Sequence, residues 1–460
     1  MAAKRPNLLF VFPDQWRKMA VGCSNDDPVY TQNIDRFAAE SVTLDHAISC
    51  FPLCSPNRAV MLTGRFPLST GVTGNCKPGL TLKLNDDELT IGNMLQKEGY
   101  RTGYIGKWHL DLPERSLNPE PPSGAVHWDA YIPPGPRRFG FDFWHAYNAN
   151  DKHMSPHYWQ DTHERIAPGE WSTKHETDVA IQFLRDQPAD QPFCLVVSWN
   201  PPHQPFEQVP DEYKAMYADQ PGYIRPNVQG DGLEQAERHM KDYFAAVTGT
   251  DREFGRLLEA LEEAGLAEDT IVVLTSDHGE TMGAHGWMEH KNIWYEESIA
   301  VPFFIRYPSG LGPRTDSVLF NSADIVPTLL GLMGVQPTEP GRIQGTDHSG
   351  LLRGEAAARP NSTFICHYPG DVDEHKQAQE EGWNINAYGW RGVRTARYTY
   401  VAEKRVGDRA VRRLMYDNEL DPYQMSPVLL DGPPRESIAA ELESELRSWL
   451  RQAGDDFCLE

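Results

Sequence analysis

Short apolar runs of strand length alternate with longer helical stretches along most of this chain. Asn7 to Phe12 and Thr270 to Thr275 are clear runs of this kind, and continuous apolar blocks are typical of parallel strands buried on both faces. Because strands and helices alternate, we predict an α/β fold with a large, mostly parallel central sheet and helices on both faces. The predicted strands are Asn7–Phe12, Val42–His46, Tyr100–Ile105, Phe193–Trp199, Thr270–Thr275 and Val301–Arg306. The predicted helices are Asn33–Glu40, one opening at Cys54, Asp87–Glu98, Thr173–Arg185, Leu233–Ala264 and Ser322–Leu332.

The last hundred residues have a different pattern, with short strands and few helices between them. Strands are predicted at Thr363–His367, Val393–Val401 and Arg412–Asp417, followed by a charged helix from about Arg435 to Gln452. We therefore predict a smaller C-terminal α+β subdomain with a short antiparallel sheet, over residues 356–460, beside a catalytic domain over residues 1–355. Within the latter, residues 112–175 are rich in proline, glycine and aromatic residues and have little periodicity, which favours a substrate-facing insertion.

Composition excludes several classes of protein. The 43 lysines and arginines stand against 66 acidic residues, and the net charge of -23 argues against a nucleic-acid partner. No apolar run is long enough to span a bilayer. Leu8 to Phe12 is too short for the apolar core of a signal peptide, so we expect a cytoplasmic protein, or a periplasmic or secreted one if a leader was removed. The 7 cysteines have no spacing typical of a disulfide framework or a zinc site.

Polar side chains follow the predicted strands at the points where they end. Asp14 and Gln15 follow the first strand, and Asp277 and His278 follow a later one. Ligands of open α/β sheets bind at the carboxyl ends of the strands, so these groups are expected to converge. Two carboxylates, an amide oxygen and an imidazole suit a divalent cation. Lys107, His109 and His203 also follow predicted strands and would lie at the same edge.

Cys54 and Arg58 are four residues apart in Cys54-Ser55-Pro56-Asn57-Arg58, one turn apart if a helix opens there. Pro56 is tolerated in the first turn of a helix. Cys54 would then lie among free N–H groups at the positive end of the helix, with Arg58 over it, which is an anion site containing a reactive side chain. The competing interpretation is a cysteine that merely packs beside a helix start.

Several motifs together resemble the type I, formylglycine-dependent sulfatases of the alkaline phosphatase superfamily. Cys54 to Arg58 with Leu62-Thr63-Gly64-Arg65 is similar to the family signature CxPxR…TGR. Later blocks also resemble the family in order, and the similarity extends from about Asn7 to Pro427. These blocks are Gly106-Lys107-Trp108-His109, Pro202-His203, Ser276-Asp277-His278-Gly279, the segment around Lys291, and Tyr416-Asp417 through Asp421-Pro422.

The resemblance implies that Cys54 is the precursor of a Cα-formylglycine, made by a formylglycine-generating or anaerobic sulfatase-maturing enzyme. The hydrated aldehyde would attack the sulfur of a sulfate ester, and its second hydroxyl would then expel sulfate. A serine lacks that second hydroxyl.

The resemblance also implies roles for the other residues. Asp14, Gln15, Asp277 and His278, together with the converted Cys54, would hold the cation. Arg58 would hold the ionised hydrate, and His203 or Lys291 would protonate the leaving oxygen. Lys107, His109 and Lys291 would neutralise the sulfate oxygens. Many members have a second acid where this chain has Gln15 and an asparagine where it has His278, so Ca²⁺ is expected but Mn²⁺ or another softer cation also suits the site.

The expected substrate is a sulfated sugar or polysaccharide fragment, or another sulfated small molecule. Aromatic and polar residues of the insertion suit sugar binding, among them Trp128, and His285 is a further pocket candidate. Two alternatives stay open. One is a phosphonate monoester or phosphodiester hydrolase of the same superfamily, and the other is an inactive binder of sulfated glycans. The substrate-binding candidates are Asp151, His153, His157, Trp159 and His285.

Overall fold

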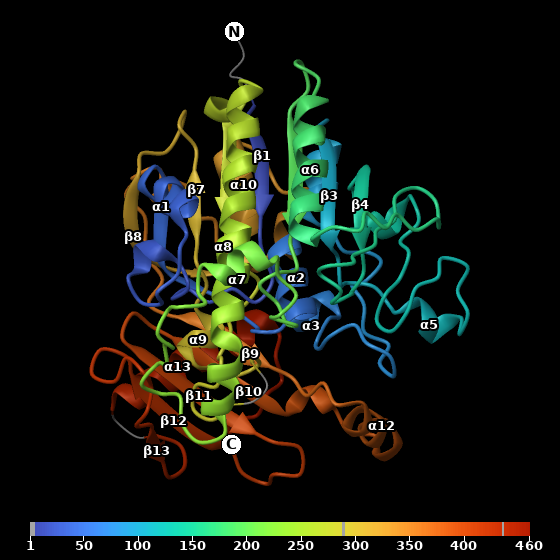
Figure 1. Ribbon diagram of the computed structural model, residues 1–460. Helices are drawn as coiled ribbons and strands as arrows, with labels where there is room; N and C mark the ends of the chain where they lie inside the picture. The colour runs from blue at the N-terminus through green and yellow to red at the C-terminus, as the bar shows by residue number, and fades with distance from the viewer. Residues whose placement is uncertain (1–4, 288–289, 435–436) are drawn as a thin grey trace.

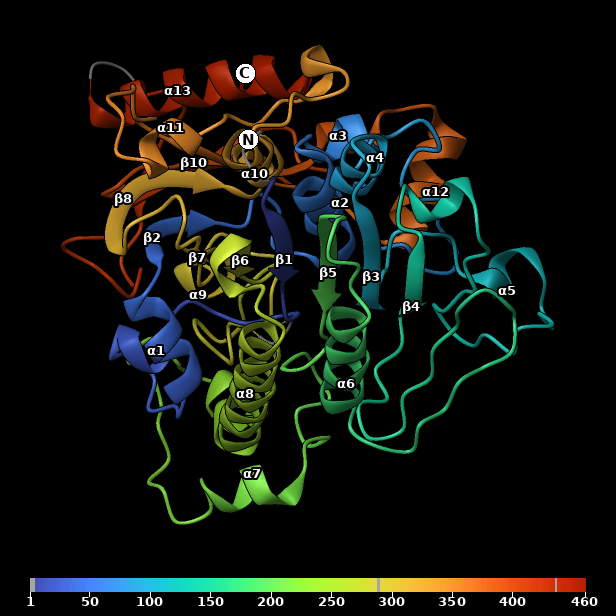
Figure 2. The ribbon, with the colours of Figure 1, turned by 90° about the horizontal axis from the view of Figure 1, so that it is seen from above.

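An eight-stranded sheet forms the centre of the molecule in the computed structural model, which describes residues 5–287, 290–434 and 437–460 (Figure 1). The strand order is β4-β3-β5-β1-β6-β7-β2-β8, and Figure 2 shows these strands side by side in that order. Neighbouring strands are parallel except β7, which is antiparallel to both β6 and β2. The mostly parallel sheet predicted from the sequence is thereby confirmed. The strands are β1 Asn7–Val11, β2 Val42–Ile48, β3 Arg101–Lys107, β4 Phe143–Tyr147, β5 Phe193–Ser198, β6 Thr270–Leu274, β7 Phe304–Arg306 and β8 Arg314–Asn321.

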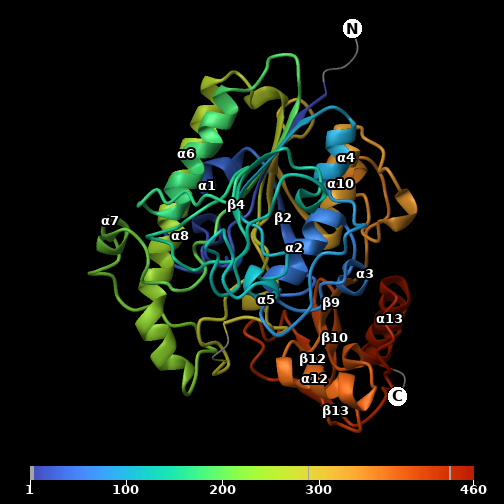
Figure 3. The ribbon, with the colours of Figure 1, turned by 90° about the vertical axis from the view of Figure 1, so that its right-hand side faces the viewer.

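Helices cover both faces of this sheet, as Figure 3 shows from the side. In β1, Leu8 and Phe10 point into one core and Leu9 and Val11 into the other, so the strand buries apolar side chains on both faces of the sheet. The first core is shared with α2, α4 and α10, and the second with α1, α6 and α8. The helices of this domain are α1 Gln32–Ala39, α2 Cys54–Thr63, α3 Pro67–Thr70, α4 Ile91–Lys97, α5 Glu114–Leu117, α6 Ser172–Arg185, α7 Asp211–Ala215, α8 Gly232–Glu263, α9 Glu296–Ile299, α10 Ile325–Met333 and α11 Ser349–Leu352.

A second, five-stranded antiparallel sheet lies beside the carboxyl ends of the central strands (Figure 1). Its residues Trp390 and Tyr416 pack against Ile293 and Trp294, and thereby support the segment that carries Lys291. Helix α13 covers another part of this unit through Leu442, Leu446 and their neighbours. The elements are β9 Thr363–His367, α12 Val372–Glu381, β10 Gly389–Arg394, β11 Tyr398–Lys404, β12 Arg412–Asp417, β13 Val428–Leu430 and α13 Ile438–Ala453.

Some predicted bounds were wrong. The strand predicted at 393–401 is a hairpin, because the chain turns between β10 and β11, where the Thr395 amide donates to Tyr398 O at 2.8 Å. The turn contains no glycine or proline, so no turn signal marks it in the sequence. Helix α4 begins only at Ile91, because the Thr90 hydroxyl caps the amides of Gly92 and Asn93. The predicted start of the last helix, Arg435, lies outside the described residues.

Strands β4 and β8 and helix α12 were not predicted. Strand β4 lies within residues 112–175 and forms one edge of the central sheet through its pairing with β3. That stretch is therefore partly a component of the main sheet and not wholly an insertion. Among the described residues, no helix combines the length and the apolar character that crossing a membrane would need.

Candidate active site

Helix α2 places Cys54 at its first residue, directed toward the carboxyl ends of β1 and β6. The preceding Leu53 is extended and provides no side-chain cap, and the helix ends at Gly64 in the left-handed conformation. The Asn75 side chain accepts a hydrogen bond from the Ser55 amide at 3.1 Å. Cys54 is almost completely buried. The helix predicted to open at this cysteine is confirmed.

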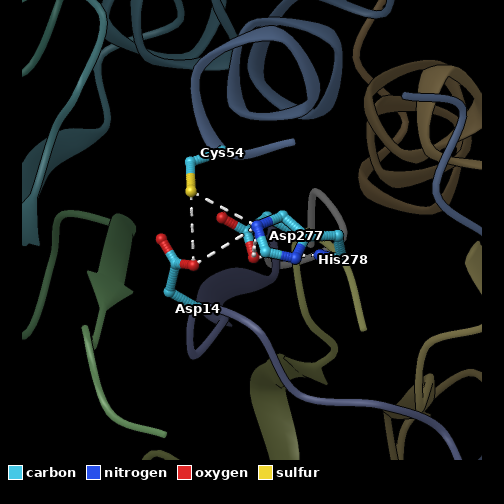
Figure 4. A group of neighbouring side chains, drawn as sticks. All are labelled: Asp14, Cys54, Asp277 and His278. Carbon is cyan, nitrogen blue, oxygen red and sulfur yellow. Dashed lines mark hydrogen bonds and ion pairs between the residues drawn. The ribbon is translucent and has the colours of Figure 1, made fainter. Parts of the chain in front are cut away.

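Two carboxylates and an imidazole surround the Cys54 sulfur (Figure 4). Cys54 Sγ lies 3.6 Å from Asp14 Oδ1 and 3.3 Å from His278 Nε2. His278 Nε2 is 3.4 Å from Asp14 Oδ1 and 3.8 Å from Asp277 Oδ1. One ligand atom from each of the four residues lies within 4.8 Å of the others. This buried set of oxygen, nitrogen and sulfur atoms is compact enough to surround a single cation.

Arg58 links the two carboxylates by hydrogen bonds. Its Nη2 donates to Asp14 Oδ2 at 2.8 Å and its Nε donates to Asp277 Oδ2 at 3.0 Å. Its Nη1 donates to the Lys107 carbonyl and to the Ser198 hydroxyl. Most of the guanidinium donors are therefore already used in hydrogen bonds within the protein. This fully buried arginine positions the two carboxylates and has little donor capacity left for an anion.

Lysines and histidines line the remaining side of the site. Lys107 Nζ is 2.8 Å from Asp14 Oδ2 and donates to Asn200 Oδ1 at 3.0 Å. Lys291 Nζ lies 3.5 Å from Cys54 Sγ and 2.9 Å from His203 Nε2. His109 is buried, and neither of its ring nitrogens has a hydrogen-bond partner among the described residues. A buried imidazole without a partner indicates a position that a ligand would complete.

Burial and neighbouring charges set the protonation of these groups. Burial opposes ionisation of Asp14, but the charges of Lys107 and other neighbours outweigh it and hold its pKa well below the usual range. Burial, together with repulsion from Asp14, raises the pKa of Asp277 to about 6. Burial lowers the pKa of His109, His203 and His278, and nearby lysines lower it further. The three imidazoles are therefore neutral near pH 7 and able to accept a hydrogen bond or bind a cation.

Comparison with known proteins shows which family this chain belongs to. Residues 6–335 match the family described as Sulfatase, and residues 283–452 match N-sulphoglucosamine sulphohydrolase, C-terminal. The chain belongs to the sulfatase family.

Similar sulfatases match nearly the whole chain. An endo-4-O-sulfatase of Bacteroides thetaiotaomicron is 37% identical over 100% of this chain and 94% of its own length. A ulvan-active sulfatase of Formosa agariphila is 35% identical over 98% of this chain and 82% of its own. A solved structure from work on glycosaminoglycan metabolism by Bacteroides thetaiotaomicron has a TM-score of 0.90 and 35% identity, and covers 98% of this chain and 97% of that one. The family match and these relatives identify this chain as an enzyme, a sulfatase.

The substrate-binding candidates of this sulfatase have different surroundings. Asp151, with a side chain 53% exposed, lies 3.5 Å from His203 Nδ1. His153 is buried, and its Nε2 is 2.9 Å from the His203 carbonyl. His157 is buried against Asp129 at 2.7 Å, and Trp159 is fully buried.

His285 stacks on Tyr295 with ring centroids 3.6 Å apart, and its Nε2 is 3.2 Å from Asn227 Nδ2. Asp151 and His153 thus adjoin His203, whereas His157, Trp159 and His285 have internal packing partners. A role in substrate binding stays a prediction for all five residues.

Sequence reasoning gave no role to several residues that support the site. Asn200 binds Lys107, Ser198 binds Arg58, and Asn57 donates to the Asp277 carbonyl. Glu280 is fully buried and accepts a hydrogen bond from the side-chain Nε2 of Gln15. Asn200 and Glu280 also follow predicted strands, so their position beyond a strand end was the signal that could have indicated them.

Proposed function

We propose that this sulfatase hydrolyses a sulfate ester on a saccharide, with a formylglycine hydrate derived from Cys54 as the nucleophile. The observation that carries the proposal is the position of Cys54, at a helix start and facing Asp14 and His278. A plain packing cysteine needs no such neighbours. The other strand-end residues converge on the same point, which supports a reaction centre there.

A divalent cation fits the site. Asp14, Asp277 and His278 would hold it, because their donor atoms are buried and adjacent. The buried Gln15, whose side-chain oxygen contacts Lys291, would add an amide oxygen. Carboxylate and amide oxygens favour Ca²⁺, and the imidazole also suits Mn²⁺. When bound, the cation supplies a fixed positive charge that polarises the sulfate.

The nucleophile requires conversion of Cys54 to the aldehyde by a maturing enzyme, followed by addition of water to give a geminal diol. One diol oxygen forms a bond to sulfur, and the bond from sulfur to the alcohol oxygen breaks. The second hydroxyl then gives its proton to the neutral His109 imidazole, the carbon–oxygen bond to the sulfate breaks, and the aldehyde forms again. The second hydroxyl is what allows release of sulfate without attack by an outside water.

Different side chains would transfer the protons and stabilise the charge of the sulfate. Asp277, whose pKa is raised to about 6, is placed to take the proton of the attacking hydroxyl. Lys107, His109 and Lys291 line the volume in which the sulfate oxygens would lie and would stabilise their charge. Lys291 and His203, 2.9 Å apart, form the pair that would deliver a proton to the leaving oxygen. An alkoxide of a sugar needs this proton because its conjugate acid is weak.

A saccharide is favoured as the carrier of the sulfate. Similar proteins are an endo-4-O-sulfatase and a ulvan-active sulfatase. Trp128 is 38% exposed, and its ring centroid is 6.0 Å from that of His109. Asn148 Nδ2 donates to the Trp128 carbonyl at 2.9 Å and holds its backbone in place. A fixed, exposed indole beside the sulfate-binding histidine provides an apolar face on which a sugar ring can stack.

The test compares turnover of sulfated saccharides, an aryl sulfate and an aryl phosphonate by the same enzyme preparation. We expect turnover of at least one sulfated saccharide. Phosphonate turnover without sulfate turnover would instead support the phosphonate hydrolase. Binding of the saccharides without any turnover, by protein that carries the aldehyde, would support an inactive binder.

Trp128→Ala tests the saccharide preference separately. We expect KM to rise for the saccharide turned over, by about tenfold, whereas KM for the aryl sulfate changes less. Tyr30→Ala is the matched control, because Tyr30 is 39% exposed and packs against Tyr217 in another part of the fold. Equal effects of Trp128→Ala on both substrates would contradict sugar stacking.

A further inference from the structure

The Gln15 carboxamide lies between one side chain that donates a hydrogen bond to it and one that accepts a hydrogen bond from it. Its Oε1 accepts a hydrogen bond from Lys291 Nζ at 2.5 Å, and its Nε2 donates to Glu280 Oε2. A lysine ammonium can only donate, and an ionised carboxylate can only accept. The partners therefore decide which way the amide points, independently of how its oxygen and nitrogen are assigned.

Glu280 is itself held by its neighbours. Its Oε1 accepts hydrogen bonds from the Met282 amide at 2.6 Å and lies 3.1 Å from His290 Nδ1. Its own amide donates to the Glu297 carbonyl at 2.8 Å. The side chain is fully buried, so it has no solvent to turn toward. Glu280 therefore presents its second oxygen to Gln15 in a fixed direction.

The backbone also holds Gln15 in place. Its φ is 66°, in the left-handed region that is unfavourable for residues other than glycine, and its amide donates to Asp277 Oδ1 at 3.1 Å. This conformation places the side chain beside Glu280 on one side and Lys291 on the other. Position 15 is thus constrained in both backbone and side chain.

We propose that Glu280 is a positioning residue, which turns the carboxamide oxygen of Gln15 toward the cation site and makes glutamine the suitable residue at position 15. A glutamate at 15 would place a second carboxylate against Glu280 with no water between them, which is unfavourable for buried groups. The glutamine provides an oxygen to one side and a donor to the other. The inference rests on the proposed cation site and names what orients one of its ligands.

Exchange of the two residues gives a first test that needs no cation. Thermal unfolding is measured in the presence of a chelator for the unchanged protein, Gln15→Glu, Glu280→Gln and the double variant. We expect Gln15→Glu to lower Tm by about 2–4 °C. The double variant should regain most of this loss, because the amide at 280 can donate to the carboxylate at 15 while its oxygen still accepts from Met282. A double variant that loses at least the sum of the two single losses would overturn the proposal.

Calorimetric titration with Ca²⁺ gives the second test. Glu280→Gln should weaken Ca²⁺ binding by about tenfold when residue 15 is glutamine, and much less in the Gln15→Ala background, where there is no amide to orient. The same loss in both backgrounds would mean that Glu280 acts by charge alone and would overturn the proposal. Asp151→Asn is the control for charge, because Asp151 contacts His203 and Asn200 and should have the same effect in both backgrounds.

Failure of the cation site itself would give a different result. If Asp14→Asn and Gln15→Ala both leave Ca²⁺ and Mn²⁺ binding unchanged, the proposed cation site is wrong and the positioning role falls with it. If Asp14→Asn abolishes binding and Glu280→Gln has no effect in the Gln15 background, the cation site stands and only the role of Glu280 is refuted.

Discussion

The buried Asp129–His157 pair and the residues around Cys54 differ in how completely their hydrogen bonds are made. Asp129 accepts from the amides of Ala130, Asn148 and Ala149 through one oxygen and contacts His157 through the other. At the carboxyl ends of the central strands, His109 has no hydrogen-bond partner among the described residues. There, Asp14, Asp277 and His278 also face one another around the Cys54 sulfur.

This difference distinguishes polar groups that stabilise the fold from polar groups that are available to a ligand. A complete set of hydrogen bonds stabilises the fold and leaves little capacity for a ligand. Incomplete bonding among like groups is unfavourable for folding and is expected where a ligand or cation supplies the missing partner. Changes in the first group should therefore affect stability, and changes in the second should affect turnover.

Cys54→Ala is expected to have the largest effect. Without a precursor for the aldehyde, kcat should fall by about 10⁴-fold or more, whereas Tm and the far-UV circular dichroism spectrum should stay close to those of the unchanged protein. Cys23→Ala is the matched control, because Cys23 is a free and exposed cysteine. Sulfatase activity retained by Cys54→Ala would refute the mechanism.

His109→Phe should have the next largest effect. The ring shape is kept and the two unpartnered nitrogens are removed, so we expect kcat for an aryl sulfate to fall by about 10²- to 10³-fold. The free energy of unfolding should not decrease, because no hydrogen bond within the described residues is lost. Urea unfolding and steady-state kinetics on the same preparation test both statements, and a large loss of stability would mean that His109 is structural.

His157→Phe should show the opposite behaviour. It removes the partner 2.7 Å from the buried Asp129 carboxylate, and the free energy of unfolding should fall by about 3 kcal/mol. The kcat for the aryl sulfate should stay close to that of the unchanged protein at a temperature where both are folded. A large fall in kcat without a loss of stability would place His157 in the catalytic group and contradict the comparison.

Substitution of Glu176 should give the smallest effect, and this effect depends on pH. It accepts from the Tyr158 hydroxyl at 2.8 Å, and burial raises its pKa from 4.5 to about 8. The folded state therefore binds the proton more tightly than the unfolded state, and stability is lost as pH rises between these values, by about 1.4 kcal/mol per pH unit.

Glu176→Gln removes this titration. Urea unfolding at pH 6 and pH 7 should show the variant gaining about 1.4 kcal/mol relative to the unchanged protein over that interval. An unchanged difference between the two proteins at the two pH values would show that Glu176 ionises normally in the folded state.

The sequence predicted the carboxyl ends of the strands better than it predicted the loops. Asp14, Lys107 and Asp277 immediately follow or end buried apolar runs, so their common location follows from the parallel sheet alone. The helix opening at Cys54 was also predicted, because its start depends on local residues such as Pro56.

The loops could not be predicted in the same way because their structure depends on contacts that are distant in sequence. Trp159 is buried by packing within the loop and His157 by its pair with Asp129, and neither contact follows from the composition of the stretch. Their role in substrate binding stays a prediction. Strand β4 was not predicted because its five residues lie in a stretch that is rich in proline, glycine and aromatic residues and has little periodicity. Glu280 follows a predicted strand, but its hydrogen bond to Gln15 depends on contacts between two loops that the sequence pattern does not show.

The most direct test of the central claim is mass spectrometry of the peptide that contains residue 54, together with specific activity, over preparations with different degrees of maturation. We expect a mass that corresponds to exchange of the CH₂SH group for an aldehyde, and activity toward a sulfate ester that is proportional to the aldehyde fraction. Full activity in a preparation whose residue 54 is entirely a thiol would contradict that claim.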